Sequence, residues 1–209
     1  MATADSGDVL PHLRTEAIRA VVGPTSADRG FAVAASGAVG RLRYDAATGR
    51  LSASVQGTAP SPYRVQVQLQ EAYDDAAEDG AGALMEPVGG RCTCPVGTDC
   101  KHVAAALYQV VRLDADQALD EAFRELTGGA APKPERLTVM GRSLVIPLAA
   151  NGVARFDFDA LCGQPLGAGD YLALASHYHT LILDGVPRLS PANYDLARRF
   201  IVLVDALYD

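Results

Sequence analysis

The sequence predicts an α+β fold, in which an antiparallel, β-rich module with a following helix precedes an α/β segment. Short alternations of apolar and polar residues at 50–57 and 63–70 predict strands that bury one face. Three cysteines and one histidine gather at 92–102, directly before an apolar helical stretch. Beyond residue 114, helical and strand-like patterns alternate along the chain, which is typical of α/β units.

The chain is long enough for two small domains, predicted at residues 1–113 and 114–209. Hydrophobic residues make up 49% of it and Trp is absent, so its cores must rely on Leu, Val and Ala. The first domain carries 10 Lys and Arg against 12 Asp and Glu, and the second carries 8 against 13. Neither has the basic excess that dominates nucleic-acid affinity, so nucleic-acid binding would have to use a local patch.

Nothing in the sequence points to a membrane. No apolar run approaches the length of about 20 residues that a membrane helix needs. The first segment, MATADSGDVLPHLRTEA, lacks the basic region and apolar core of a signal peptide. We therefore expect a cytoplasmic location, where thiols stay reduced and clustered cysteines are more often metal ligands than disulfides.

The expected elements of the first domain lead toward the cysteines. Residues 10–22 predict a short amphipathic helix, and the acidic stretch 71–87 predicts a solvated loop. Three or four antiparallel strands are expected between them, from the runs 31–36, 39–44, 50–57 and 63–70, with a turn at 47–50. In the last run, Val65, Val67 and Leu69 share one face, and Gln66, Gln68 and Gln70 share the other.

The cysteines and the histidine form two pairs, Cys92-x-Cys94 and Cys100-x-His102, which five residues separate. Zinc prefers four tetrahedral sulfur or nitrogen ligands. The first pair would lie on one face of an extended strand, and the second would lie at the start of a helix. Four protein ligands leave no position for water, so we predict a structural Zn²⁺ site. The alternative, small buried cysteines beside an ordinary histidine, is disfavoured by the paired spacing.

The stretch CTCPVGTDCKHVAAALY resembles the SWIM zinc finger, whose pattern is CxC, a spacer, then CxH before an apolar helix. The β-rich residues before it look like the region that precedes this motif in bacterial Snf-type helicases, so the resemblance covers about 25–112. It implies zinc on Cys92, Cys94, Cys100 and His102. It also implies a module that binds DNA or a protein partner of the helicase or ATPase type, and no small-molecule substrate.

Basic residues near the predicted strands are candidates for contacts with nucleic acid. Arg41, Arg43, Arg50 and Arg64 lie on or between the strands, and Arg91 and Lys101 flank the cysteines. Arg41 and Arg43 are two apart in a strand and therefore share a face. The alternative is that these are solvated side chains of an outer face, offset by the acidic run DDAAED nearby.

The second domain predicts helices and strands in alternation. The helix 114–129 has an apolar stripe and ends at Gly128, and Ser190 with Pro191 begins a last helix. Between them we expect a linker-like break at 130–135, a strand pair at 136–149 that turns at Gly141, an extended run at 153–161, a short helix at 169–178 and a buried strand at 180–186.

The second domain is similar to the C-terminal portion of the ZapE-like (AFG-type) P-loop ATPases over about 114–209. The phrases FDFDALC, DYLALA, HTLILDGVPRL and ARRFIVLVDALYD carry the resemblance. It implies part of an enzyme that acts in bacterial cell division or mitochondrial protein quality control.

ATP hydrolysis needs a glycine-rich loop that ends in Gly-Lys-Ser or Gly-Lys-Thr. This sequence has two lysines, Lys101 and Lys133, and neither follows a glycine. We therefore predict an incomplete, non-catalytic α/β segment, with an ATP-hydrolysing ZapE-like enzyme as the alternative.

Overall fold

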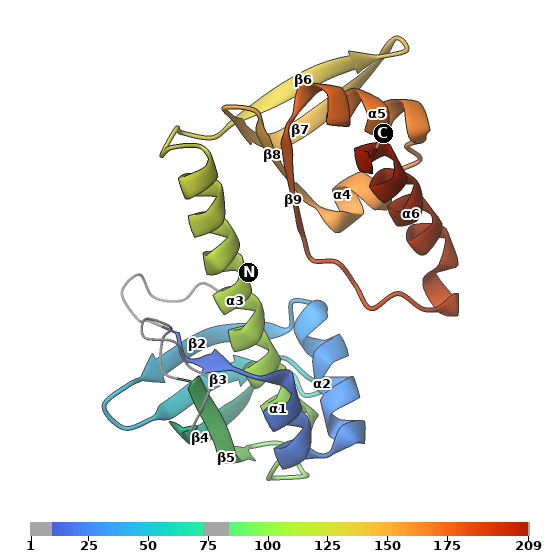
Figure 1. The fold of residues 1–209 in the computed structure, drawn as a ribbon. Coiled ribbons are helices and arrows are strands. Elements are labelled where there is room, and N and C mark those ends of the chain that lie inside the picture. The colour runs from blue at the N-terminus through green and yellow to red at the C-terminus, as the bar shows by residue number, and fades with distance from the viewer. Residues whose placement is uncertain (1–9, 73–83, 209) are drawn as a thin grey trace. The chain divides into compact units, whose positions relative to one another are not determined.

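The computed structural model describes residues 10–72 and 84–208, which form two compact units (Figure 1). Unit 1 comprises Met1–Ala115 and unit 2 comprises Asp116–Asp209. The division lies inside one long helix, α3 (Lys101–Leu126), and the predicted domain boundary at 113–114 also lies there. The mixed helix and strand content confirms the predicted α+β class.

Unit 1 is built around a five-stranded sheet in the order β1-β5-β4-β3-β2, which is antiparallel except for the parallel pair of β1 and β5. Its elements are β1 (His12–Leu13), α1 (Thr15–Val22), α2 (Pro24–Ala35), β2 (Val39–Asp45), β3 (Arg50–Val55), β4 (Tyr63–Glu71) and β5 (Leu84–Cys92), followed by α3.

One face of this sheet is apolar and packs against α3. Val65, Val67 and Leu69 of β4 are at most 2% exposed, as their alternation predicts. The first three turns of α3 lie in the same core and are buried all round, from Val103 to Val110. The opposite face of β4, with its glutamines, is exposed to solvent.

Two parts of unit 1 differ from the sequence-based expectation. The run 31–36, expected as a strand, lies almost wholly in α2, because small residues suit a close helix contact as well as a strand. A Cβ added to Gly30 would lie 2.3 Å from the Cβ of Ala104, so α2 and α3 nearly touch there. The acidic segment is not all loop, since β5 begins at Leu84; its residues 73–83 lie outside the described part of the chain.

Unit 2 has a four-stranded sheet in the order β6-β7-β8-β9. Its elements after α3 are β6 (Lys133–Val139), β7 (Arg142–Ala150), β8 (Val153–Asp157), α4 (Phe158–Cys162), α5 (Ala168–His177), β9 (Thr180–Asp184), the 3-10 turn η1 (Pro191–Asn193) and α6 (Tyr194–Tyr208). The helices α4, α5 and α6 share a core with one sheet face, and Phe123 of α3 packs on the other. Because β8 and β9 pair in parallel across α4 and α5, the predicted α/β unit is confirmed.

The corrections in unit 2 have local causes. The apolar helix expected after the cysteines and the helix expected at 114–129 are one helix, because no helix-breaking residue separates them. Asp114 lies inside this helix and accepts a hydrogen bond from His12. Residues 158–161 turn into α4 because Asp157 caps it through the backbone N–H of Asp159. The strand β6 begins inside the break expected at 130–135.

The turn and cap predictions in unit 2 are confirmed. Met140 and Gly141 form the turn between β6 and β7, both with positive φ. Ser190 caps the 3-10 turn η1, which leads into α6 at Tyr194, by accepting a hydrogen bond from the backbone N–H of Ala192. The strand at 180–184 is a half-buried edge strand, less enclosed than predicted. Within the described ranges, no helix has the length and apolar character needed to cross a membrane.

The buried guanidinium group of Arg155 links three elements of unit 2. The side chain of Arg155 in β8 is only 8% exposed and forms ion pairs with Asp120 of α3 and with Asp184, whose Oδ2 accepts from Nε at 2.7 Å. The other oxygen of Asp184 is buried and has no hydrogen-bond partner among the described residues. Asp184 at the end of β9 is therefore held by an arginine, which is a structural role.

We predict that Arg155→Met destabilises unit 2, because it leaves the Asp184 carboxylate buried and unpaired. The free energy of opening of β8 and β9, measured by native-state hydrogen exchange, should fall by roughly 3 kcal/mol. Adding Asp184→Leu to the same chain should recover most of this loss. A double variant as unstable as the single one would contradict this account of the pair.

Candidate metal centre

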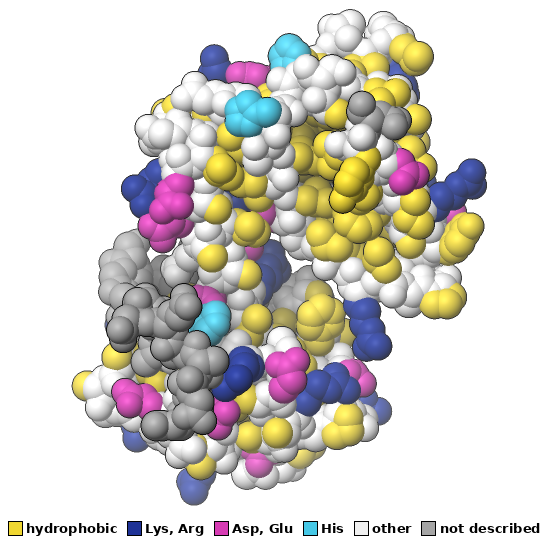
Figure 2. Space-filling view, viewed as in Figure 1, with side chains coloured by type: hydrophobic (Ala, Val, Ile, Leu, Met, Phe, Trp, Pro, Cys, Tyr) yellow, Lys and Arg dark blue, Asp and Glu magenta, His cyan; other side chains and the backbone are white. Residues whose placement is uncertain are grey.

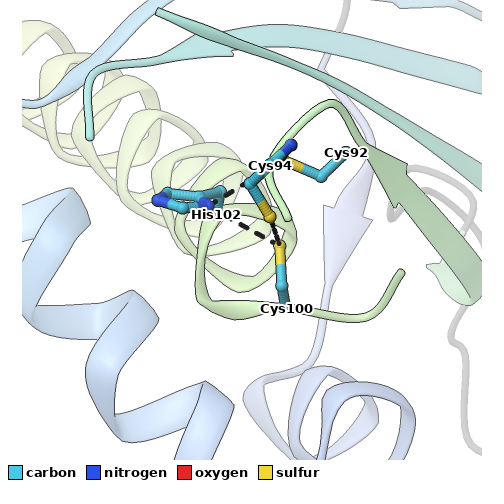
Figure 3. Close-up of side chains that lie close together, drawn as sticks. All are labelled: Cys92, Cys94, Cys100 and His102. Atoms are coloured by element: carbon cyan, nitrogen blue, oxygen red, sulfur yellow. Dashed lines mark hydrogen bonds between the residues drawn. The ribbon is translucent and has the colours of Figure 1, made fainter. Parts of the chain in front are cut away.

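Three thiols and one imidazole converge at the end of the unit 1 sheet (Figure 3). All four residues are buried, and their ligand atoms lie within 4.8 Å of one another. The Cys94 and Cys100 sulfurs are 3.5 Å apart, and the Nδ1 of His102 lies 3.7 Å from the Cys100 sulfur and 3.9 Å from that of Cys92. The edges of a tetrahedron around zinc are about 3.8 Å long for bonds of about 2.3 Å. The donor set and its spacing therefore fit Zn²⁺.

A short turn between β5 and α3 brings the ligands together. Cys92 is the last residue of β5. The backbone N–H of Cys94 donates to the Cys92 sulfur at 3.4 Å, so the chain curls around the Cys92 sulfur. The expectation of both thiols on one extended strand is corrected here, because Cys94 lies beyond the strand. Gly97, with φ 86°, turns the chain back, and its carbonyl accepts from the Cys92 N–H at 2.7 Å.

The second pair of ligands lies where α3 begins, as predicted. The carbonyl of Cys100 accepts the first helical hydrogen bond, from Ala104 at 3.0 Å, and His102 lies in the first turn. Just before them, Asp99 has a positive φ of 40°, and its Oδ1 accepts from the backbone N–H of Gly90 in β5 at 2.8 Å. This hydrogen bond fastens the turn to the strand.

Neighbouring residues fix the orientation of the imidazole. The Tyr63 ring lies 4.7 Å from that of His102, centroid to centroid. A Cβ added to Gly57 would lie 2.5 Å from Tyr63 Cε2 and 3.0 Å from His102 Nε2. Only a glycine leaves room there, so Tyr63 and Gly57 together hold Nδ1 toward the thiols. Such supporting contacts tune metal sites strongly.

Burial controls the protonation of the ligands. It raises the pKa of the Cys92 thiol to about 12 and also raises that of Cys100. Burial would raise the pKa of Cys94 too, but hydrogen bonds from the Gly97 N–H and the neighbouring thiols outweigh it and lower that pKa. Burial, with Lys101 nearby, lowers the pKa of His102 and keeps it neutral. Since zinc takes thiolates and neutral imidazole, its binding releases protons and strengthens as pH rises.

The outer face of the sheet beside the centre carries arginines in register. Arg43 pairs with Ser52, Ser52 with Gln66, and Gln66 with Arg91, which makes one row across β2, β3, β4 and β5. Residues directly opposite one another in a sheet point to the same side. Arg64 and Arg41 are exposed next to this row, Arg64 opposite Ser54 and Arg41 at the irregular point of β2.

Of the basic residues predicted to contact nucleic acid, Lys101 is separated from the others. It lies half-buried in the first turn of α3, which packs on the inner face of the sheet. Arg50, one of the basic residues singled out in the sequence, lines a groove of about 450 Å³ with Gln66, Gln68, Arg91 and Asp99. Arg50 lies two residues before Ser52 in β3 and therefore shares its face of the sheet.

Two protein-family models match the chain. The SWIM zinc finger matches residues 63–111, and the AFG1-like ATPase matches residues 100–209. Both predicted resemblances are thereby confirmed, with different bounds. The zinc finger match leaves out residues 25–62, so the likeness of that region to helicase-associated sequences stays a prediction. The ATPase-like match begins at Cys100 and therefore includes the whole of α3.

The chain is 48% identical over 75 residues to an uncharacterized protein of Schizosaccharomyces pombe, which is 36% of this chain and 16% of the relative. It is 40% identical over 98 residues to lactation elevated protein 1 homolog B of Danio rerio, 46% of this chain and 20% of that protein. The chain is 32% identical over 91 residues to the cell division protein ZapE of Escherichia coli, which is 44% of this chain and 24% of ZapE.

The chain thus spans at most about a quarter of the length of these curated relatives. No solved structure matches it.

We predict one zinc per chain in protein purified without added metal, measured by elemental analysis. Cys92→Ser should lose the zinc and the helical circular dichroism signal of unit 1, because binding energy at such a site is folding energy. Cys162→Ser is the matched control, since Cys162 is a fully buried thiol of unit 2 outside the cluster. A folded Cys92→Ser chain that retains zinc would overturn the assignment.

We also predict that Gly57→Ala weakens zinc binding about 10-fold, because the new methyl group displaces Tyr63 and His102. Competition with a chromogenic chelator measures this affinity. Gly89→Ala is the control, because an added Cβ there meets only the Asp99 carboxylate at 3.9 Å. Equal affinities of the two variants would show that the Tyr63 contact does not orient the imidazole.

Proposed function

The chain belongs to the AFG1-like ATPase family, which matches its residues 100–209, and we propose that it binds DNA through its zinc-ordered unit 1 without hydrolysing ATP itself. The observation that carries this proposal is the row of polar and basic side chains on the outer face of the unit 1 sheet. ATP hydrolysis is not proposed for this chain because its sequence contains no Gly-Lys pair to bind phosphates.

The row has the dimensions and chemistry of a phosphate-binding surface. Four strands spaced by about 4.8 Å place Arg43 and Arg91 at opposite ends of a strip of roughly 14 Å. The hydroxyl of Ser52 and the amide of Gln66 lie between them. Arginine guanidinium groups bind phosphate oxygens in a bidentate manner, and hydroxyl and amide groups add hydrogen bonds to the backbone of nucleic acid.

Two acids near the row, Asp45 and Asp99, already accept hydrogen bonds within unit 1. Asp45 accepts hydrogen bonds from the Thr48 hydroxyl and the Ala47 N–H, and these lower its pKa. Asp99 accepts from the Gly90 N–H at the edge of the groove. Among the residues that the structure describes, the arginines Arg43, Arg50, Arg64 and Arg91 outnumber the carboxylates of Asp45, Glu86 and Asp99 on this face, although the whole chain has a net charge of −7.

The zinc site supports this surface directly. Arg91 precedes the ligand Cys92, and it forms a bridge with Thr98 in the turn that the four ligands close. Just beyond the end of β5, the backbone N–H of Arg64 in β4 donates to the Thr93 hydroxyl at 3.0 Å. Metal binding therefore fixes the backbone of the β4 and β5 segments that carry Arg64 and Arg91. A protein partner of the helicase or ATPase type remains a prediction from the resemblance.

We predict that Arg64→Glu with Arg91→Glu reduces affinity for a fluorescein-labelled DNA 20-mer at least 10-fold, as measured by anisotropy at low salt. Both side chains are exposed, so zinc content and folding should not change. The slope of log affinity against log salt should fall by about 2, since each arginine accounts for about one phosphate contact.

Arg136→Glu with Arg188→Glu provides the matched control, because it gives the same net charge change on exposed arginines of unit 2. This control should bind DNA within about 2-fold of the unchanged chain. Absence of DNA binding at low salt by the zinc-loaded protein would reject the proposal. Equal losses in the two double variants would reject the role of the sheet face.

A further inference from the structure

The helix α6 has an apolar inner face that belongs to the core of unit 2. Leu203 and Ala206 are buried, and Phe200 packs on Phe158 of α4 with ring centroids 5.7 Å apart. Arg199 donates to the carbonyl of Cys162 at 3.0 Å. These contacts fix which side of α6 faces the sheet and which side faces outward.

The outward side of α6 is also apolar. Tyr194, Ile201 and Tyr208 recur every seven residues and are 66%, 59% and 88% exposed. Ala197 and Val204 lie between them and are half-buried, so the spacing alternates between three and four residues. This is the spacing of the contact seam of a coiled coil. Hydrophobic side chains gather over the region of α6 in Figure 2.

Two opposite charges flank this seam on the same side. Arg198 and Asp205 are also seven residues apart, and each follows a seam residue directly. Both are exposed, and neither forms an ion pair within the part of the chain that the structure describes. In coiled coils, charges at such flanking positions select the partner and its direction.

We propose that this seam of α6, consisting of Tyr194, Ala197, Ile201, Val204 and Tyr208, binds the same seam of a second copy of the chain in antiparallel orientation. Ile201 then faces Val204 of the second copy, and the large Tyr208 faces the small Ala197. In this register Arg198 lies beside Asp205 of the second copy, and the two-fold axis creates that ion pair twice.

The charges argue against a parallel pair. In a parallel pair, the residue that precedes a seam position on one helix lies beside the residue that follows a seam position on the other helix. Asp205 would then lie near the apolar Phe200 of the second copy instead of near its Arg198. The antiparallel pair uses the same patch on both copies, so it closes as a dimer and does not extend into a fibre. This inference is independent of DNA binding and of the zinc site.

One helix pair buries less surface than the roughly 1,200 Å² of a stable interface, so the dimer should form reversibly at tens of micromolar protein. Sedimentation equilibrium of the full zinc-loaded chain from about 5 to 500 μM tests this range. We expect the weight-average mass to rise from one copy toward two. A constant mass of one copy, 21.9 kDa, over the whole range would overturn the proposal.

Ile201→Glu should weaken dimerisation more than 10-fold, because it places a charge at the centre of the seam. Val186→Glu is the matched control, since Val186 is an exposed apolar residue of unit 2 outside α6, 46% exposed. Circular dichroism establishes that both variants are folded. A dimer that survives Ile201→Glu, or one that Val186→Glu also abolishes, would show that α6 is not the contact.

A charge exchange tests the direction of the pair. Arg198→Asp and Asp205→Arg should each weaken dimerisation about 10-fold, because each places like charges together. Both changes in one chain should restore the unchanged affinity within about 2-fold, since the ion pairs re-form with their signs reversed. A double variant no better than the single ones would overturn the antiparallel register.

Discussion

Four ligand atoms must meet at one point, and much of unit 1 follows from that constraint. Cys92 ends the strand β5, Cys94 lies in the turn, and Cys100 and His102 begin α3. Zinc bound there fixes the angle at which the strand passes into the helix. A domain with no tryptophan and few aromatic side chains has limited apolar surface to order these segments alone, so metal binding supplies part of its folding free energy.

The long helix α3 contributes residues to both units, up to Ala115 in unit 1 and from Asp116 in unit 2. Its first turns pack closely on their neighbours because small residues face it: an added Cβ at Gly90 would lie 2.4 Å from Val103 Cγ1, and Gly30 meets Ala104 in the same way. Further along, Asp120 and Phe123 take part in the ion pairs and the core of unit 2. The zinc finger and the ATPase-like match overlap in this helix, at residues 100–111.

The two units present surfaces of different chemistry. The outer face of the unit 1 sheet is polar and basic, whereas the outer face of α6 in unit 2 is apolar with one charge of each sign at its flank. The first suits phosphates, which are numerous and regularly spaced along nucleic acid. The second suits an identical helix, because both charges find their opposites there.

The sequence alone determined the zinc ligands, the strands at 50–55 and 63–71 and the capped last helix, because spacing and alternation are local properties. It did not determine that residues 31–35 are helical, since small residues fit either structure until Gly30 meets Ala104. Nor did it show that Arg50 joins Arg91 at one groove, or that α6 keeps an exposed second face. Strand register and helix packing decide those features, because they depend on residues far apart in the chain.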